Sequence, residues 1–243
     1  MAISSPPRRD DQAAARRQRG LIAGLILALV AVVVLAAVVA VLLARGGSPG
    51  SGLQGSGVPA TQSRVLSRFS SVDLAGSNKV TVDVGRRQSV VVHADSNLLR
   101  HVTTRVVAGT LVIGTTGTFT TRSPMSVDVS LPALGAVTLS GSGEISVTGI
   151  HEPRLIVTLS GSGVLDASGT ATQLDVTLGG SGLAQLDNLV ARDVRAVVAG
   201  SGVISVTVTA RLNAAVPGTG AIIYSGNAKV TSSVTGTGSV THR

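Results

Sequence analysis

"LSGSG" at residues 139–143 is the stretch that decides the fold, because close variants of it return five more times. The later copies are "LSGSG" (159–163), "LGGSG" (178–182), "VAGSG" (198–202), "VPGTG" (216–220) and "VTGTG" (234–238). The second glycine of each copy recurs every 18 to 20 residues. A fixed period of this length is typical of a solenoid, in which each repeat contributes one coil.

Apolar residues alternate with other residues on both sides of each copy. Before the copy at 159–163, Leu155, Val157 and Leu159 alternate, and after the copy at 139–143, Ile145 and Val147 do the same. A period of two is typical of a strand with one buried face. No helical stretch separates these strands, so we expect coils that stack directly, with equivalent strands paired in parallel about 4.8 Å apart.

A second corner is predicted six residues after the last glycine of most copies. Gly149, Gly169, Asn188 and Gly226 stand there, and Gly and Asn tolerate a positive φ in a turn. Each coil then reads as strand, glycine corner, strand, Gly/Asn corner and a short third side. The third sides carry Ala171, Val190, Ala210 and Ala228. In this arrangement Leu159, Leu178 and Val198 should stack on one inner ladder.

The recurring glycines are predicted to form one structural edge, where they permit backbone torsions or close approaches that a Cβ would forbid. They are Gly141, Gly143, Gly161, Gly163, Gly180, Gly182, Gly200, Gly202, Gly218, Gly220, Gly236 and Gly238. Between them, one hydroxyl per copy should form a ladder, made of Ser142, Ser162, Ser181, Ser201, Thr219 and Thr237. Two interpretations of this ladder stay open: local caps for corner backbone groups, or a polar surface that contacts glycan or another envelope polymer.

The N-terminal region predicts a membrane anchor. Residues 21–43 carry no charge, and at about 1.5 Å per residue a helix of that length spans roughly 34 Å, enough to cross a hydrocarbon core. Five Arg precede this run, so the positive-inside rule places the N-terminus in the cytoplasm. We predict an Arg-rich cytoplasmic tail (1–20) and a single transmembrane helix (21–44). The alternative is a cleaved signal peptide and a secreted domain.

The rest of the chain divides by composition. Residues 45–63 are rich in Gly, Ser and Pro and predict a flexible linker. Residues 64–243 predict the β-helix domain, with irregular first coils and an N-terminal cap over 64–130 and regular repeats over 131–243. His242 and Arg243 are expected to blunt the open C-terminal edge against end-to-end stacking.

Composition excludes several kinds of chemistry. The chain has no Cys, which excludes disulfides and thiolate sites, and its 1% of aromatic residues argue against nucleic-acid binding. The acidic residues of the repeats fall at different phases, so no carboxylate ladder is expected, and "HAD" at 93–95 offers too few ligands for a metal. We therefore predict no catalytic residues, no metal site and no cofactor.

The segment "VTLSGSGEISVTG", with the later "LSGSG" and "GTGAI" repeats, resembles the putative auto-transporter adhesin, head GIN domain family of bacterial envelope proteins. The opening "RFSSVDLAG…VTVDVG…VVVHADSNLL" is also similar to that family, and the resemblance covers roughly 64–240. It implies an all-β, right-handed parallel β-helix that is exported or tethered to the membrane. It transfers no catalytic residue to this chain.

These observations together predict a membrane-tethered, non-enzymatic domain outside the cytoplasmic membrane, with a binding, adhesion-like or scaffolding role in the cell envelope. The expected partners are an envelope glycan or another membrane protein, besides the membrane that holds the anchor. Arg64, Arg68, Arg86 and Arg87 lie near the linker and could favour anionic head groups. The alternatives are a sensory or regulatory membrane protein and a polysaccharide-active enzyme.

Overall fold

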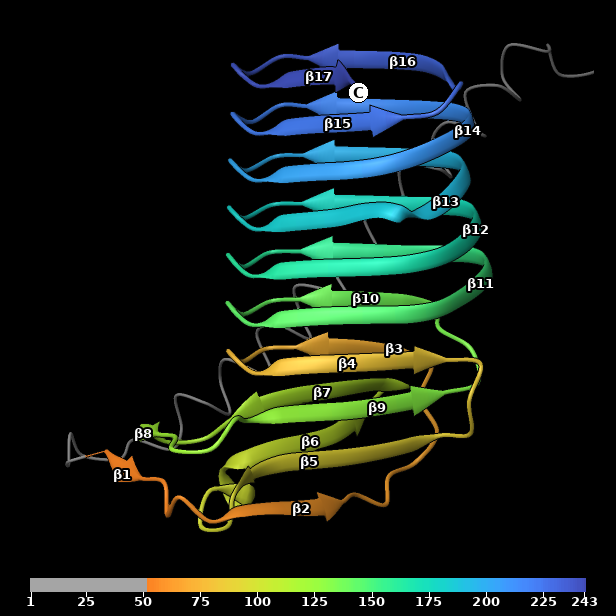
Figure 1. Ribbon diagram of the computed structural model, residues 1–243. Helices are drawn as coiled ribbons and strands as arrows, with labels where there is room; N and C mark the ends of the chain where they lie inside the picture. The colour runs from red at the N-terminus through yellow and green to blue at the C-terminus, as the bar shows by residue number, and fades with distance from the viewer. Residues whose placement is uncertain (1–51) are drawn as a thin grey trace, which may run out of the picture. The chain divides into compact units, whose positions relative to one another are not determined.

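In a computed structural model, which describes residues 52–243, the glycine-containing repeats form flat coils that stack on one another (Figure 1). Each coil contributes one strand segment to a first face, directly after the glycine corner, and one to a second face, directly before the next corner. The strands of these coils are β10 (Ala136–Leu139), β11 (Glu144–Leu159), β12 (Val164–Leu178), β13 (Leu183–Val198), β14 (Val203–Val216), β15 (Ala221–Ser225), β16 (Lys229–Val234) and β17 (Ser239–His242). All of them pair in parallel. The predicted all-β fold with stacked parallel coils is confirmed.

The alternating residues fill the space between the two faces. Leu159 lies directly opposite Leu178, which lies opposite Val198, and all three side chains are fully buried. On the first face, Ile145 pairs with Leu165 in the same way. The predicted inner ladder is therefore confirmed, and the core is a column of aliphatic side chains that repeats at the strand spacing.

The second corner is where the long strands bend from one face to the other. Gly149, Gly169 and Gly226 take positive φ angles of 76°, 132° and 96°, as predicted for this corner, whereas Asn188 is not among the residues with positive φ. Between the pairs Leu186–Val206 and Val190–Thr207, strand β13 contains three more residues than β14, so the pairing register shifts there. Because a shift by an odd number of residues turns side chains to the other face, Leu189 is buried and Val190, predicted on the third side, is 41% exposed.

The regular stack begins earlier in the sequence than predicted. Strands β3 (Ser71–Leu74) and β4 (Lys79–Val84) form a complete coil, whose corner 76–78 reads Gly-Ser-Asn. This coil pairs in parallel with β10 and β11 on one side, and with β7 (Thr110–Thr115) and β9 (Ser126–Leu131) on the other. Figure 1 shows the β3–β4 coil between two coils that follow each other in the chain. The order of the coils in space thus differs from their order in the sequence.

The other strands lie at the N-terminal end of the stack. Pairing there is antiparallel, between β2 (Pro59–Ser63) and β5 (Ser89–Asp95), β5 and β9, and β6 (Val102–Val107) and β7. A 3-10 helix, η1 (Leu99–His101), precedes β6, and β1 (Leu53–Gln54) pairs with β8 (Phe119–Thr120). Antiparallel strands and buried Phe69 and Leu98 close the aliphatic core at this end.

The described part of the predicted linker is ordered structure. Strands β1 and β2 lie within 45–63, and a buried carboxylate, Asp95, holds the residues between them. Its oxygens accept hydrogen bonds from the backbone N–H of Gly57 (2.9 Å) and Arg122 (2.8 Å), and from the backbone (3.3 Å) and hydroxyl (2.9 Å) of Ser123. The linker prediction is wrong for these residues, because their backbone donors are paired: Gly57 with Asp95, Ser56 with Asn97, and Leu53 and Gly55 with the carbonyls of Thr118 and Thr120.

Asp95 gives the domain a predicted sensitivity to acid. The hydrogen bond from the Arg122 backbone, helped by those of Ser123 and Gly57, holds the pKa of Asp95 below its usual 3.8 despite burial. Its stabilising contribution is therefore present above pH 3.8 and is lost as the pH falls through the lower pKa of the folded state. We expect Asp95→Asn to lower the free energy of unfolding near neutral pH, by an amount that shrinks as the pH falls below 3.8 and Asp95 of the wild type becomes protonated.

Urea unfolding of both proteins across this pH range would measure the effect, and a difference that stays constant with pH would contradict it. Burial raises the pKa of Asp73, which is opposite to the shift of Asp95. The hydrogen bond from the Ser140 hydroxyl lowers the pKa of Asp73 by less than burial raises it. Both proteins retain Asp73, so its contribution cancels in the comparison.

The C-terminal end is an open edge within the described chain, since β16 and β17 each pair with a strand on one side only. The ring of His242 packs against Tyr224 at 4.9 Å, and Arg243 donates its backbone N–H to the carbonyl of Tyr224 (2.9 Å). Arg243 also approaches Asp187 at 3.9 Å. His242 belongs to the edge strand β17, and the side chains of both residues contact the preceding coils. The expected blunting of this edge stays a prediction.

No helix among residues 52–243 is long and apolar enough to cross a membrane. The predicted cytoplasmic tail (1–20) and transmembrane helix (21–44) lie outside the described residues.

Candidate functional site

Close approach of successive coils explains the recurring glycines. A Cβ on Gly161 would overlap the carbonyl of Gly141 in the coil before it, and one on Gly180 would overlap the carbonyl of Gly161. The corner glycines of all six copies meet the same obstacle, and none of them has a positive φ. Of the two predicted reasons for glycine at this edge, closeness is correct and unusual torsion is not.

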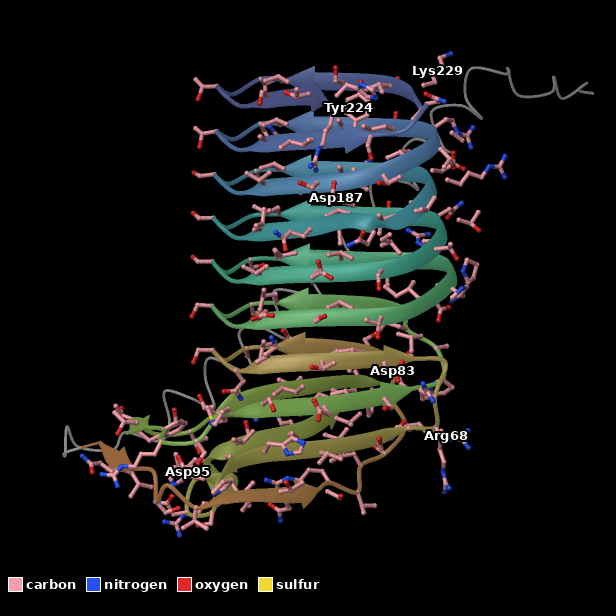
Figure 2. All side chains as sticks on the ribbon, viewed as in Figure 1. Arg68, Asp83, Asp95, Asp187, Tyr224 and Lys229 are labelled. Atoms are coloured by element: carbon pink, nitrogen blue, oxygen red, sulfur yellow. The ribbon has the colours of Figure 1, made fainter. Side chains whose placement is uncertain are left out.

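The six hydroxyls of the predicted ladder lie on this edge and are exposed. Figure 2 shows short side chains projecting outward along the stacked corners. Among residues 52–243, these six hydroxyls make one hydrogen bond to the protein, which runs from Thr219 Oγ1 to Ser201 Oγ at 2.9 Å. They are therefore not caps for the corner backbone, and their donors and acceptors face solvent.

A second polar surface lies on the second face and contains five charged side chains, those of Arg154, Asp175, Asp193, Arg195 and Arg211. It is a groove of about 340 Å³, here called the arginine–aspartate groove. Its lining comes from four successive coils and consists of Arg154, Gln173, Asp175, Asp193, Val194, Arg195, Arg211 and Asn213.

Strand register determines how these side chains meet. Arg154, Gln173, Asp193, Arg211 and Lys229 lie opposite one another in successive strands and form one ladder. In the neighbouring ladder, Asp175, Arg195, Asn213 and Thr231 follow in the same manner. Residues far apart in the sequence are thereby brought to the strand spacing of about 4.8 Å.

Two ion pairs cross the groove between coils. Arg211 binds Asp193 through two parallel contacts, Nε to Oδ1 at 2.8 Å and Nη2 to Oδ2 at 3.1 Å. Arg154 donates from Nη2 to Asp175 Oδ2 at 2.6 Å. The hydrogen bond from Arg211 holds the pKa of Asp193 below its usual value, and Asp193 in turn raises the pKa of Arg211.

The groove does not suit acid–base cleavage of a glycosidic bond. A general acid at neutral pH needs a raised pKa, whereas the pKa of Asp193 is lowered and Asp175 is held by an arginine. The remaining surface chemistry is recognition, through guanidinium groups, carboxylates and amides.

The sequence did not predict the arginine–aspartate groove, although its acidic residues indeed do not stack on one another. Positions 154, 173, 193, 211 and 229 follow the same period of 18 to 20 residues as the glycine corners. That period places Arg211 opposite Asp193, but it places Arg154 opposite Gln173, so it indicates only one of the two Arg–Asp contacts.

The other residues considered from the sequence are dispersed. His93 lies between Thr61 (Oγ1 to Nδ1, 3.1 Å) and Asp128 (Oδ2 to Nε2, 3.0 Å), away from the buried Asp95 that the "HAD" segment suggested as its companion. Glu144 pairs with Lys79 at 2.9 Å. Residues 52–243 contain no group of three or more His, Asp or Glu side chains that could hold a metal ion.

The basic residues near the linker are also partly engaged. Arg64 donates from Nη2 to the carbonyl of Leu99 (2.8 Å), and Arg86 pairs with Asp83 at 2.9 Å. Arg68 projects away from the coils (Figure 2). The side chain of Gln88 bonds to the backbone of Leu66, Ser67 and Phe69, so Arg87 lies next to the segment that carries Arg68. The contact with anionic head groups stays a prediction.

Comparison with known proteins agrees with the fold and the repeats. The family model described as "Putative auto-transporter adhesin, head GIN domain" matches residues 68–228. The chain belongs to this family. The resemblance inferred from the "LSGSG" repeats is thus confirmed.

Solved structures show that the head GIN domain described here has a known fold. The crystal structure of a putative adhesin from Bacteroides fragilis has a TM-score of 0.66 and 21% sequence identity, and covers 79% of this chain and 100% of that chain. One of a putative adhesin from Parabacteroides distasonis has a TM-score of 0.50 and 19% identity, with coverage of 79% and 100%. No curated protein matches the chain. At these identities the shared property is the fold.

Proposed function

We propose that the head GIN domain of this chain is tethered outside the cytoplasmic membrane and acts as a non-enzymatic binding domain of the cell envelope. The observation that carries the binding role is the outer surface of the coils, where polar side chains repeat at the strand spacing and Arg154 and Arg211 pair with the groove carboxylates. The family description, an adhesin head domain, supports the same role.

The location rests on the apolar run at 21–43 and on the five Arg before it. Because strand β1 begins at Leu53, residues 45–52 are all that separate the predicted span from ordered structure. This segment is shorter than the predicted linker, which favours partners close to the membrane, such as an envelope glycan or another membrane protein. We also propose right-handed winding of the coils, on the general rule that parallel crossover connections are right-handed.

The absence of Cys from the chain permits a clean test of this topology. Ser201→Cys places a thiol on the exposed corner edge, and Ser5→Cys places one in the predicted cytoplasmic tail. In spheroplasts of the source cell, a membrane-impermeant maleimide should label the first variant at once and the second only after lysis. Labelling of Ser201→Cys only after lysis would reject an extracytoplasmic domain, and release of the labelled domain into the medium would favour the secreted alternative.

A further inference from the structure

We propose that the arginine–aspartate groove binds a carboxylate-bearing polysaccharide that lies along the stacking direction of the coils. This inference rests on the proposed function, because it names the ligand class of an envelope-binding domain.

The groove presents more positive than negative charge to an approaching ligand. Arg195 and Lys229 are exposed and have no ion pair within the described residues, in addition to the paired Arg154 and Arg211. Lys229 lies opposite Arg211 in the next strand and projects from the edge of the domain (Figure 2). Three arginines within the groove and Lys229 beside it outnumber the two aspartates, so an anion gains attraction that the internal ion pairs do not cancel.

The two carboxylates lie deeper than the guanidinium groups that hold them. The side chains of Arg211 and Arg154 are 68% and 60% exposed, whereas those of Asp193 and Asp175 are 21% and 34% exposed. A ligand therefore meets the cations first. The aspartates orient the arginine forks, and such planar forks bind carboxylates through two parallel hydrogen bonds.

The repeat of the groove favours a polysaccharide over a compact anion. Equivalent side chains return in each coil at about 4.8 Å, and a pyranose unit in an extended chain advances by a similar distance. The amides of Gln173 and Asn213 and the hydroxyl of Thr231 stand in the same two ladders as the charged groups. Sugar hydroxyls can pair with these groups while the carboxylates of the same polymer reach the arginines.

The two aspartates also disfavour a densely charged ligand. A polyphosphate places charge along its whole length, so some of it would lie next to Asp175 or Asp193. The first face differs in sign, because Glu144, Asp166 and Asp187 point outward there. A polyanion should therefore bind one face of the domain.

The test measures binding of the purified full-length chain to polygalacturonate, with dextran as the neutral control. Removing the two unpaired cations together, by Arg195→Gln and Lys229→Gln, should weaken binding by at least about tenfold, the loss expected for charge-assisted contacts. Asp175→Asn should strengthen it by about threefold, because it removes a repelling charge and frees Arg154. Asp187→Asn on the first face is the matched control and should leave the affinity unchanged. Circular dichroism would establish that all variants are folded.

Results that would overturn the inference are equal binding of dextran and polygalacturonate, an unchanged affinity of the double variant, or weaker binding by Asp175→Asn. Stronger binding to vesicles of anionic lipid than to polygalacturonate would also overturn it and would assign the groove to a membrane surface. Co-sedimentation with cell-wall polymer from the source cell tests the groove assignment separately from the proposed envelope-binding function. If the wild-type chain and the double variant sediment equally, the envelope-binding function stands and the groove assignment fails. If neither sediments, the groove assignment and a glycan partner are both rejected, and another membrane protein is left as the partner of the domain.

Discussion

Gly161→Ala is expected to prevent folding or to lower the free energy of unfolding by more than about 4 kcal/mol, a loss that indicates a specific structural conflict. The added methyl group would occupy the position of the Gly141 carbonyl in the preceding coil. That carbonyl belongs to a corner held by both faces, so relieving the overlap requires the parallel pairing on either side to separate. Far-UV circular dichroism and thermal unfolding of the full-length chain would measure the loss.

Two neighbouring substitutions serve as controls. Gly179 stands at the same edge, but the nearest atom to its added Cβ would be the Leu159 carbonyl oxygen at 4.0 Å. Gly179→Ala should therefore stay within about 0.5 kcal/mol of the wild type, as should a surface substitution. Ser162→Ala removes an exposed hydroxyl and should cost about 1 kcal/mol or less. Equal losses in Gly161→Ala and Gly179→Ala would refute the explanation by close approach.

Val198→Asp is expected to have a similarly large effect through the core. Val198 is fully buried in the ladder that it forms with Leu178, and the structure offers no partner for a carboxylate among those aliphatic side chains. An unpaired charge at such a position costs far more than the whole stability of a typical domain, so the protein either protonates the group or unfolds. We expect no folded protein at neutral pH, measured by the same thermal unfolding.

The adjacent residue provides the matched control. Val197 lies on the outer side of the same strand, opposite Thr177 and near the exposed Arg195. Val197→Asp should therefore change stability by less than about 1 kcal/mol, as expected for a charge that remains solvated. Should Val197→Asp be the more damaging of the two, the inside and outside assignments of this strand would be reversed.

The repeated part of the domain was predictable because the physical requirement is the same in every coil. The alternation around Leu159 and Leu178 marks the buried face, and the glycine at 161 or 180 marks the corner, since each residue meets its own counterpart one coil away. A repeated sequence reports a repeated environment. The sequence could not distinguish torsion from crowding as the reason for glycine, because both requirements select the same residue.

The start of the stack could not be predicted in this way. The coil of β3 and β4 lies between coils that are continuous in the sequence, and its corner ends in Asn78 where later corners have glycine. Its place is fixed by pairing between segments more than sixty residues apart, such as Val72 with Val137. Local periodicity contains no information on such an insertion.

The sequence by itself determined the all-β solenoid, its corners, the inner aliphatic ladder and the family. The tertiary structure decided which charged side chains meet. Arg154 binds Asp175, and Arg211 binds Asp193, because parallel pairing places the outward-facing side chains of one coil beside those of the next. Likewise, Asp95 orders residues that read as a flexible linker, because its buried carboxylate satisfies the backbone donors of Gly57 and Arg122. Both outcomes depend on contacts between residues remote in the chain, which composition does not encode and which the repeat period indicates only for Arg211 and Asp193.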